Sequence, residues 1–372
     1  MKSNYDILGN HIRLIDTRNR ESITDRVLGI NIDKFFMPSV ANVIGTDLSK
    51  YKLITKGKFA CNPMHVGRDE RLPVALYDEE KPAIVSPAYF MFEVIDNSIL
   101  NEDYLMMWFR RPEFDRICWL HTDGSVRGGI TWDDICRLEL PIPPIENQLE
   151  IVNSYKEITE RIALKQKIND NLEAAMRALF EHFVVSNEAY DFDEAIDDKI
   201  DFINGLAMQN YRPEKDETPI PVIKIRELSQ GYCDENSEFC SNHIDKSHII
   251  QNGDLVFSWS GSLQASFWTS QTAGLNQHLF KVQSDEYPLW FVYEWVTFHL
   301  LNFQRIAENK GTTFGHIKRE DLHNAKIKSV GIDEINKLNN LFQPLLNTII
   351  ANSTELHSLM NYQRVLLARL SR

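Results

Sequence analysis

The chain has 372 residues, 43% of them hydrophobic and 25% charged, which is the composition of an ordinary folded protein with room for two or three domains. Its 53 acidic and 40 basic side chains give a formal net charge of −13, the wrong sign for a protein that binds nucleic acid unaided. The opening residues MKSNYDILGN lack an apolar signal core, and no run of 18 apolar residues occurs, so we expect a cytoplasmic protein without a membrane span.

Residues 1–145 are predicted to form a mixed α/β domain. Short β-branched and aromatic runs predict strands at VLGINI (27–32), KFACN (58–62) and AIVSPAYFMFEVI (83–95). Helical spacing of apolar residues continues through 102–120, although Pro112 should kink or divide that helix. A glycine-punctuated loop then leads to a short helical turn near 135.

A long helix is predicted to follow the proline-rich lead-in PIPPIENQ (141–148). The run from 151 to 185 contains no Gly or Pro, and steps of four and three residues trace an apolar heptad seam that is polar only in its middle. The seam comprises Ile151, Tyr155, Ile158, Ile162, Lys165, Asn169, Leu172, Met176, Leu179 and Phe183. At ~1.5 Å per residue the helix is roughly 50 Å long, and a helix with such a seam needs a partner.

The second half of the chain repeats this order. Strands are predicted within 218–228, 249–262 and 275–282, and the turn Asn252-Gly253 precedes an alternating apolar run. A helix is predicted over 288–307, and a loop follows over 308–322.

A spacing of 187 residues relates the two halves. It carries Trp108 to Trp295, Gly128 to Gly315 and Ile130 to Ile317. It also yields a second seam: Leu338, Phe342, Leu345, Ile349, Asn352, Leu356, Leu359, Gln363, Leu366 and Leu370. Agreement at one spacing over so many positions indicates an internal duplication. Lys165 and Asn352 form the matching polar centres, and Pro344 should kink the second helix or delay its start.

The predicted fold class is therefore α/β, of the mixed α+β kind, with two pseudo-symmetric globular domains and a long antiparallel two-helix coiled coil. The domains are expected at 1–145 and 187–331, and the helices at 146–186 and 332–372.

Motifs for catalysis are missing from the sequence. There is no P-loop, HExxH, GxSxG or Cys/His metal pattern, and the five scattered cysteines indicate reduced thiols. The loops GSVRGG (124–129) and GTTFG (311–315) are too loose for a nucleotide fingerprint. They are either plain connections or, because both copies keep glycines beside cations, phosphate contacts.

At PIPPIENQLEIV (141–152) the sequence resembles the opening of a helical region in specificity subunits of type I restriction-modification systems. DFINGLAMQNYRP (201–213), VIKIREL (222–228), NGDLVFSWSGS (252–262) and LNQHLFKV (275–282) resemble the target-recognition domain of that family. Two departures occur: the second lead-in reads AKIKSVGIDE (325–334), and the first copy has KFACNPMHVGRDERLPVA (58–75) in place of GDLVFSWSGS. The two domains should therefore share a fold but recognise different targets.

The resemblance implies a non-catalytic subunit that binds double-stranded DNA. Each domain would read one half of a bipartite site, and the helices would set the distance between the halves. Two methyltransferase subunits would dock on the chain, using S-adenosylmethionine, and motor-nuclease subunits would join for cleavage. The resemblance implies no cofactor and no metal in this chain.

Charge leaves a second hypothesis open. Residues 187–331 carry 13 basic and 22 acidic side chains, which suits a solvated or partner-facing surface and suggests that partner subunits supply much of the phosphate affinity. The alternative is a non-catalytic coiled-coil scaffold without DNA sequence specificity. A hydrolase built on Asp and Glu pairs comes third, because no paired spacing recurs in both copies.

Base-reading residues are predicted from side-chain chemistry alone: Arg and Lys suit guanine, and Asn and Gln suit adenine. In the first copy the candidates are Lys56, Lys58, Asn62, His65, Arg68, Arg71 and Arg127. In the second copy they are Lys224, Arg226, Trp259, Ser260, Gln264, Asn276, Gln277, His278, Lys310, Thr312 and Lys318. Trp108 and Trp295, at helical spacing, are predicted to be core residues.

Overall fold

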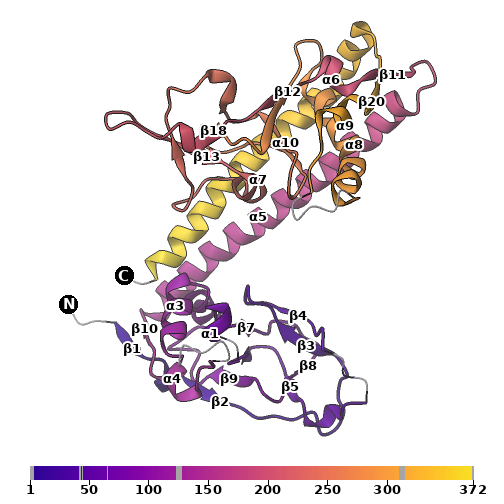
Figure 1. Cartoon of the computed structure of the whole chain (residues 1–372). Helices are drawn as coiled ribbons and strands as arrows, with labels where there is room; N and C mark the ends of the chain where they lie inside the picture. Colours follow the sequence, from indigo (N-terminus) through magenta and orange to yellow (C-terminus); the bar gives the residue numbers. More distant parts are fainter. Residues whose placement is uncertain are drawn as a thin grey trace. The chain divides into compact units, whose positions relative to one another are not determined.

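The structure is a computed structural model that describes residues 4–41, 43, 45–64, 66–122, 128–309 and 315–370. The chain divides into two compact units (Figure 1). Unit 1 comprises residues 1–160 and 362–372, and unit 2 comprises residues 161–361. Both units mix strands and helices, which confirms the predicted fold class.

Unit 1 contains two four-stranded sheets and a two-stranded pair. The first sheet has the order β2 (Ile12–Leu14), β9 (Phe90–Val94), β6 (Phe59–Cys61) and β7 (Val74–Leu76), all antiparallel. The second has the order β4 (Phe36–Pro38), β3 (Val27–Ile30), β8 (Ala83–Val85) and β5 (Lys52–Ile54), with β3 and β8 parallel. Strand β1 (Tyr5–Ile7) pairs with β10 (Glu139–Pro141).

The helices of unit 1 follow the predicted signals. Pro112 divides the predicted helix into α2 (Glu102–Phe109) and α3 (Pro112–Leu120), where it occupies the first turn and needs no backbone donor. The short helix α4 (Trp132–Cys136) begins with a capping box between Thr131 and Asp134. A single turn, α1 (Val66–Asp69), lies between β6 and β7.

Unit 2 repeats both sheets. One has the order β12 (Asp201–Asn204), β19 (Leu279–Gln283), β16 (Leu255–Ser258) and β17 (Ala265–Phe267). The other has the order β14 (Phe239–Cys240), β13 (Ile220–Ile223), β18 (Ala273–Leu275) and β15 (Ile249–Ile250), again with its second and third strands parallel. Strand β11 (Phe192–Ala195) pairs with β20 (Lys326–Lys328), as β1 pairs with β10. The shared strand order is the structural form of the internal duplication.

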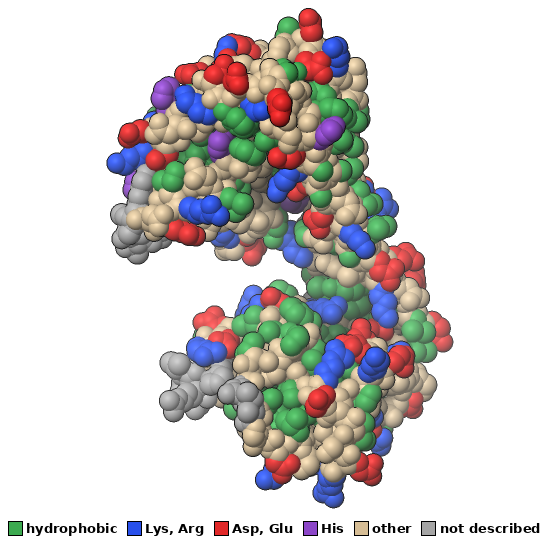
Figure 2. All heavy atoms as spheres, turned by 90° about the vertical axis from the view of Figure 1, so that its right-hand side faces the viewer, with side chains coloured by type: hydrophobic (Ala, Val, Ile, Leu, Met, Phe, Trp, Pro, Cys, Tyr) green, Lys and Arg blue, Asp and Glu red, His purple; other side chains and the backbone are tan. Residues whose placement is uncertain are grey.

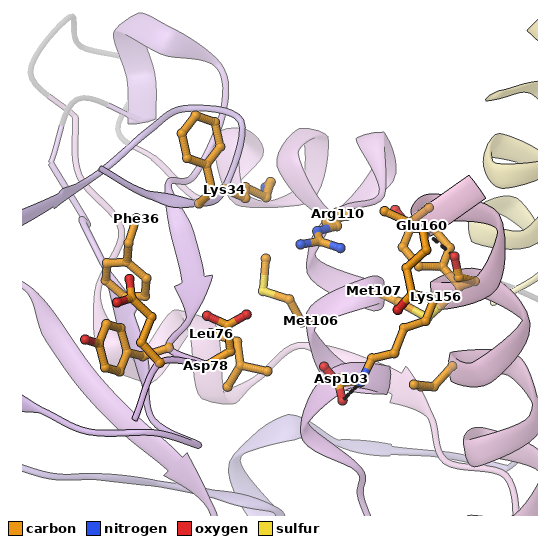
Figure 3. A pocket seen from close by; sticks show the side chains of 16 residues that line it. Lys34, Phe36, Leu76, Asp78, Asp103, Met106, Met107, Arg110, Lys156 and Glu160 are labelled. Atoms are coloured by element: carbon orange, nitrogen blue, oxygen red, sulfur yellow. Dashed lines mark hydrogen bonds and ion pairs between the residues drawn. The ribbon is translucent and has the colours of Figure 1, made fainter. Parts of the chain in front are cut away.

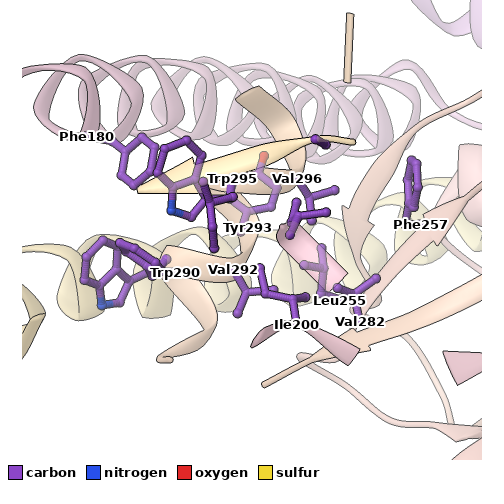
Figure 4. Packing of buried hydrophobic residues seen from close by; sticks show 14 of the residues in the cluster. Phe180, Ile200, Leu255, Phe257, Val282, Trp290, Val292, Tyr293, Trp295 and Val296 are labelled. Atoms are coloured by element: carbon purple, nitrogen blue, oxygen red, sulfur yellow. The ribbon is translucent and has the colours of Figure 1, made fainter. Parts of the chain in front are cut away.

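The helices of unit 2 are α6 (Ile196–Lys199), α7 (Ile225–Gln230), α8 (Leu289–Asn309) and α9 (Arg319–His323). Helix α8 has no proline within it and continues unbroken where α2 and α3 are separate. Its buried face joins the largest core of the chain (Figure 4). Trp295 is fully buried there and Trp108 is 3% exposed in unit 1, which confirms both as core residues.

The two long helices are α5 (Ile145–Phe180), extended by a π-helical turn (Glu181–Val185), and α10 (Ile332–Arg369). Within unit 2 they lie side by side and antiparallel (Figure 1): Arg161 is ion-paired with Glu355, and Asn169 Nδ2 donates to the carbonyl oxygen of Ile349. Helix α10 begins well before Pro344 and passes through it, so the proline does not delay the helix start.

Most predicted seam positions are buried or half-buried. The fully buried ones are Tyr155, Ile162, Asn169, Met176, Leu338, Phe342, Ile349 and Leu370. The half-buried ones are Ile151, Ile158, Lys165, Leu172, Leu179, Leu345, Asn352, Leu356, Leu359, Gln363 and Leu366. Phe183 differs, being 37% exposed, while Phe180 and Val184 are buried. From Met176 onward the buried positions advance by four residues into the π-helical turn Glu181–Val185, so burial departs there from the heptad phase.

Candidate nucleic-acid interface

In unit 2 the loop between β16 and β17, residues 259–264, is held from three sides. Ser258 N–H donates to the carbonyl oxygen of Gln264 at 2.9 Å and closes the base of the loop. Ile317 N–H donates to the carbonyl oxygen of Trp259 at 3.0 Å, and Gly261 N–H donates to the carbonyl oxygen of Gly315 at 2.9 Å. The loop backbone is therefore fixed against the segment that precedes α9.

Unit 1 uses the same bonds for the loop between β6 and β7, residues 63–73. Asn62 N–H donates to the carbonyl oxygen of Pro73 at 2.9 Å, and Ile130 N–H donates to that of Pro63 at 3.1 Å. Gly67 N–H donates to the carbonyl oxygen of Gly128 at 3.0 Å. These pairs make Asn62 the counterpart of Ser258 and Pro63 the counterpart of Trp259. We call residues 63–73 and 259–264 the paired loops.

A buried leucine ends each paired loop, and the neighbouring helix holds it. In unit 1 the Asp115 carboxylate on α3 accepts from Leu72 N–H at 3.0 Å and from Lys34 Nζ at 2.5 Å. In unit 2 the Gln304 amide on α8 donates to the carbonyl oxygen of Leu263 at 3.0 Å. The two copies therefore present different sequences on equivalent supports.

In unit 2, four predicted contact residues gather around its paired loop. Trp259, Ser260 and His278 line one cavity of about 500 Å³ together with Ile225, Gly261 and His316. Gln264, on the same loop, donates through its side-chain amide to Ser229 Oγ at 2.7 Å. Ile225, Gly261 and His316 were not predicted. The sequence alone does not indicate them, because they come from three separate segments that only the fold brings together.

The next two predicted residues lie in the β18–β19 turn, which also carries His278. Asn276 is buried, and its carboxamide oxygen accepts from His278 N–H at 3.2 Å, so it shapes the turn. Gln277 is exposed, with its amide nitrogen 3.5 Å from His278 Nε2. Of these two side chains, Gln277 is therefore the one available to a ligand.

The predicted cations of unit 1 are engaged by carboxylates. Lys56 pairs with Glu80 and Lys58 with Glu93. Arg68 pairs with Asp69 at 2.6 Å, and Arg71 pairs with Asp33 at 2.8 Å. Asn62 Oδ1 accepts from Met64 N–H at 3.2 Å, within the start of the paired loop. Phosphate or guanine would have to share these cations with their carboxylates or displace the carboxylates.

In unit 2, Lys224 and Arg226 are engaged by carboxylates in the same way. Lys224 Nζ lies 2.6 Å from Glu238 Oε1, and this hydrogen bond lowers the pKa of Glu238. Arg226 lies 2.9 Å from Asp234 and 2.6 Å from Glu227, and its bonds to these two carboxylates raise the pKa of the guanidinium. Lys318 is exposed at the start of α9. Acidic and basic side chains are interspersed on the face shown in Figure 2.

Four predicted residues, His65, Arg127, Lys310 and Thr312, lie outside the described residues. They stay predictions. The glycine loops 124–129 and 311–315 lie mostly outside them as well.

Unit 1 has a cavity of about 500 Å³ between its sheets and the start of α5 (Figure 3). Met106 and Met107 of α2 contribute to its wall, and Arg110 lies over the Tyr155 ring at 5.9 Å. Lys156 Nζ closes one side through an ion pair of 2.6 Å with Asp103. The Lys156 ammonium is thus balanced by a carboxylate within the wall, as are Arg68 and Arg71 in the paired loop of unit 1.

Among the described residues, Asp197, Asp198 and His323 are the group whose ligand atoms could hold a metal ion. The group already has a structural role, because His323 Nδ1 lies 3.0 Å from Asp197 and Asp198 accepts from Ala195 N–H at 3.3 Å. Within the described ranges, no helix combines the length and apolarity needed to cross a bilayer.

No family model matches the chain. Over 328 residues, 81% of this chain and 75% of the other, it is 23% identical to the MjaIX specificity subunit of a type I restriction enzyme from Methanocaldococcus jannaschii. It is 29% identical to the EcoBI specificity subunit from Escherichia coli over 101 residues, which is 27% of this chain and 21% of that one.

A crystal structure of the S subunit of a type I restriction-modification system from M. genitalium superimposes with a TM-score of 0.59 at 12% identity. The superposition covers 99% of this chain and 96% of the other and shows a shared fold. The predicted resemblance is thus confirmed: the chain is similar to specificity subunits of type I restriction enzymes along most of its length.

Proposed function

We propose that the chain is a sequence-specific DNA-binding specificity subunit of a type I restriction-modification complex and performs no chemistry itself. The observation that carries the proposal is the pair of loops. Three equivalent backbone hydrogen bonds hold them in both units, yet apart from the supporting glycines Gly67 and Gly261 and the leucines Leu72 and Leu263 the loops differ in sequence and in length. A duplicated support with diverged loops is what two readers of two different targets require.

In this proposal each unit reads one half of a bipartite, asymmetric DNA site. The antiparallel helices α5 and α10 set the length of the non-specific spacer between the halves. The similarity to specificity subunits supports this role, and the division into two units of the same strand order supports one reader for each half.

The proposed partners are double-stranded DNA, two methyltransferase subunits that use S-adenosylmethionine to methylate adenine, and motor-nuclease subunits that join for cleavage. The charges of this chain support a need for partner subunits in binding the DNA phosphates. The net charge is −13, and six candidate cations are ion-paired: Lys56, Lys58, Arg68 and Arg71 in unit 1 and Lys224 and Arg226 in unit 2. Counterion release on DNA therefore falls largely to cations of the methyltransferase subunits.

The test is methylation-sensitive sequencing of host DNA with this chain present and deleted. We expect adenine methylation at one bipartite motif in the presence of the chain and none at that motif in its absence. Re-expression of the chain from a plasmid is the control. Identical methylation with and without the chain would contradict the proposal.

The paired cations also favour a second candidate, a scaffold that assembles the same partners without selecting sequence. Reconstitution separates the two. A specificity subunit makes the complex prefer its motif over scrambled DNA of equal length, whereas a scaffold leaves binding equal for both.

A further inference from the structure

We infer that the cavity beside Trp259 in unit 2 is a thymine-reading pocket that receives the C5-methyl group of one T·A pair. This inference rests on the proposed function and deepens it. The pocket is lined by Ile225, Trp259, Ser260, Gly261, His278 and His316.

The pocket lies at positions where the two units carry different side chains on the same backbone support. Trp259 and His316 occupy the positions held by Pro63 and Gly129 in unit 1, as the shared hydrogen bonds define them. Unit 1 therefore has no aromatic ring at either position. The equivalent supports thus carry an aromatic wall only in unit 2.

The lining is suited to a methyl group. Ile225 and the Trp259 ring supply apolar surface, and the ring centroid of Trp259 lies 5.9 Å from that of His278 and 6.4 Å from that of His316. Gly261 has a positive φ of 65° and no side chain, so its backbone forms part of the cavity wall. Apolar contact with the C5-methyl is how side chains distinguish thymine in the major groove.

The charges around the pocket also favour contact with an uncharged group of the base. None of the six lining residues is acidic, although unit 2 is rich in carboxylates. The two candidate cations beside Ile225 are engaged elsewhere, Lys224 by Glu238 and Arg226 by Asp234. Reading guanine with these cations would compete with both ion pairs, whereas a methyl contact leaves them intact.

Hydrogen-bond donors stand next to the apolar wall. The indole Nε1 of Trp259 is buried and does not face the cavity, so the exposed imidazole of His278 is the donor that a base can reach. Ser260 Oγ lies 3.1 Å from His278 Nδ1, so when the hydroxyl donates, Nε2 carries the ring proton. Thymine presents a carbonyl acceptor, O4, beside its methyl group, and this combination matches a donor beside an apolar surface.

The experiment removes only the methyl group. The chain is reconstituted with its methyltransferase subunits, and affinity is measured for duplexes in which each thymine of the motif is replaced in turn by uracil. We expect one position to lose about fourfold in affinity, the value for one buried methyl group. With the variant Ile225→Ala, thymine and uracil should bind equally well at that position.

Two further variants keep the result interpretable. His278→Phe removes the imidazole donor but keeps an aromatic ring, so binding should weaken while the preference for thymine over uracil persists. Ile249→Ala, a half-buried isoleucine of unit 2 outside the pocket, should change neither quantity.

The outcomes separate this inference from the proposed function. A motif-specific complex that is indifferent to uracil at every position overturns the thymine pocket alone. The same holds if the thymine preference survives Ile225→Ala. A complex with no sequence preference at all overturns both.

Discussion

Lys165 Nζ donates a hydrogen bond to Asn352 Oδ1 at 2.8 Å, so the polar centres of the two helical seams meet. The contact belongs to a network. Asn352 Nδ2 donates to Asn169 Oδ1 at 2.9 Å, and Lys165 is ion-paired with Glu355 at 2.7 Å. An antiparallel pair in any other register would leave these half-buried groups without partners, which gives the network a role in fixing register.

A double-mutant cycle tests this coupling. Asn352→Leu leaves Lys165 and Asn169 short of a partner and should lower the free energy of unfolding by about 1–3 kcal/mol. Adding Lys165→Leu should recover part of that loss, since both ends of the broken bond are then apolar. Urea denaturation of the four proteins measures the coupling. Strict additivity would show that the contact is not coupled in the folded state.

The buried ion pair of Lys34 and Asp115 should position the unit 1 paired loop. Asp115→Asn leaves the Lys34 ammonium, which is 2% exposed, without its counter-charge and should destabilise the fold by about 3–5 kcal/mol. Burial lowers the pKa of Lys34, so part of this loss is recovered if the lysine deprotonates. Thermal unfolding measures the effect.

An apolar variant at the same position makes a functional prediction. In reconstituted complexes, Asp115→Leu should weaken selection of one half-site and leave the other unchanged, because it removes the acceptor that holds Leu72 N–H at the end of the loop. The double variant Lys34→Met, Asp115→Leu should restore stability but not the Leu72 contact. Equal weakening of both half-sites would contradict a role confined to unit 1.

Glu294 should make unit 2 sensitive to pH. Burial raises the pKa of this carboxyl to about 7, Arg177 opposes the rise and Glu173 adds to it. Since the pKa is higher in the folded state than the unfolded value of 4.5, the protonated form favours folding. That contribution is complete below about pH 4.5 and is lost as the pH rises through about 7.

Glu294→Gln should therefore match the parent near pH 4.5 and be more stable at pH 8, by up to about 3 kcal/mol. Melting temperatures across this range provide the measurement. The exposed Glu308→Gln on the same helix is the matched control. A variant that gains no stability at pH 8 would show that Glu294 is ionised in the fold without penalty.

The helices should act as a ruler if they set the spacer. A seven-residue insertion near Lys165 and another near Asn352 preserve the seam and add on the order of 10 Å. Along DNA this is about three base pairs. Methylation mapping should then show unchanged half-sites with a spacer longer by a few base pairs. A folded variant that still methylates at the original spacing would rule out the ruler.

Local patterns in the chain predict its main helices and its duplication, but not its strands in full: the predicted strand 83–95 is two strands, β8 and β9, in different sheets. Apolar spacing predicts α8 and the two long helices, Pro112 marks the break between α2 and α3, and the polar centres at Lys165 and Asn352 predict their own contact. Each of these signals depends on residues close together in the sequence or on a periodicity that a single helix imposes.

The constant spacing of 187 residues fails at the paired loops. It would align Asn62 with Ile249, whereas the backbone hydrogen bonds make Ser258 the counterpart of Asn62. The loops of the two units differ in length. These insertions change the sequence spacing between strands that remain equivalent in space. Hydrogen bonds across the sheet reveal the correspondence, and a single sequence does not contain them.

Side-chain availability was also decided by tertiary structure. Chemistry alone made Lys58, Arg71 and Lys224 candidates for base contacts, but the fold brings Glu93, Asp33 and Glu238 against them from distant segments. Ile225 and His316, conversely, reach Trp259 only after the chain has folded. Local spacing sets which face of an element a side chain occupies, whereas its charge partner and its cavity depend on which other elements pack there.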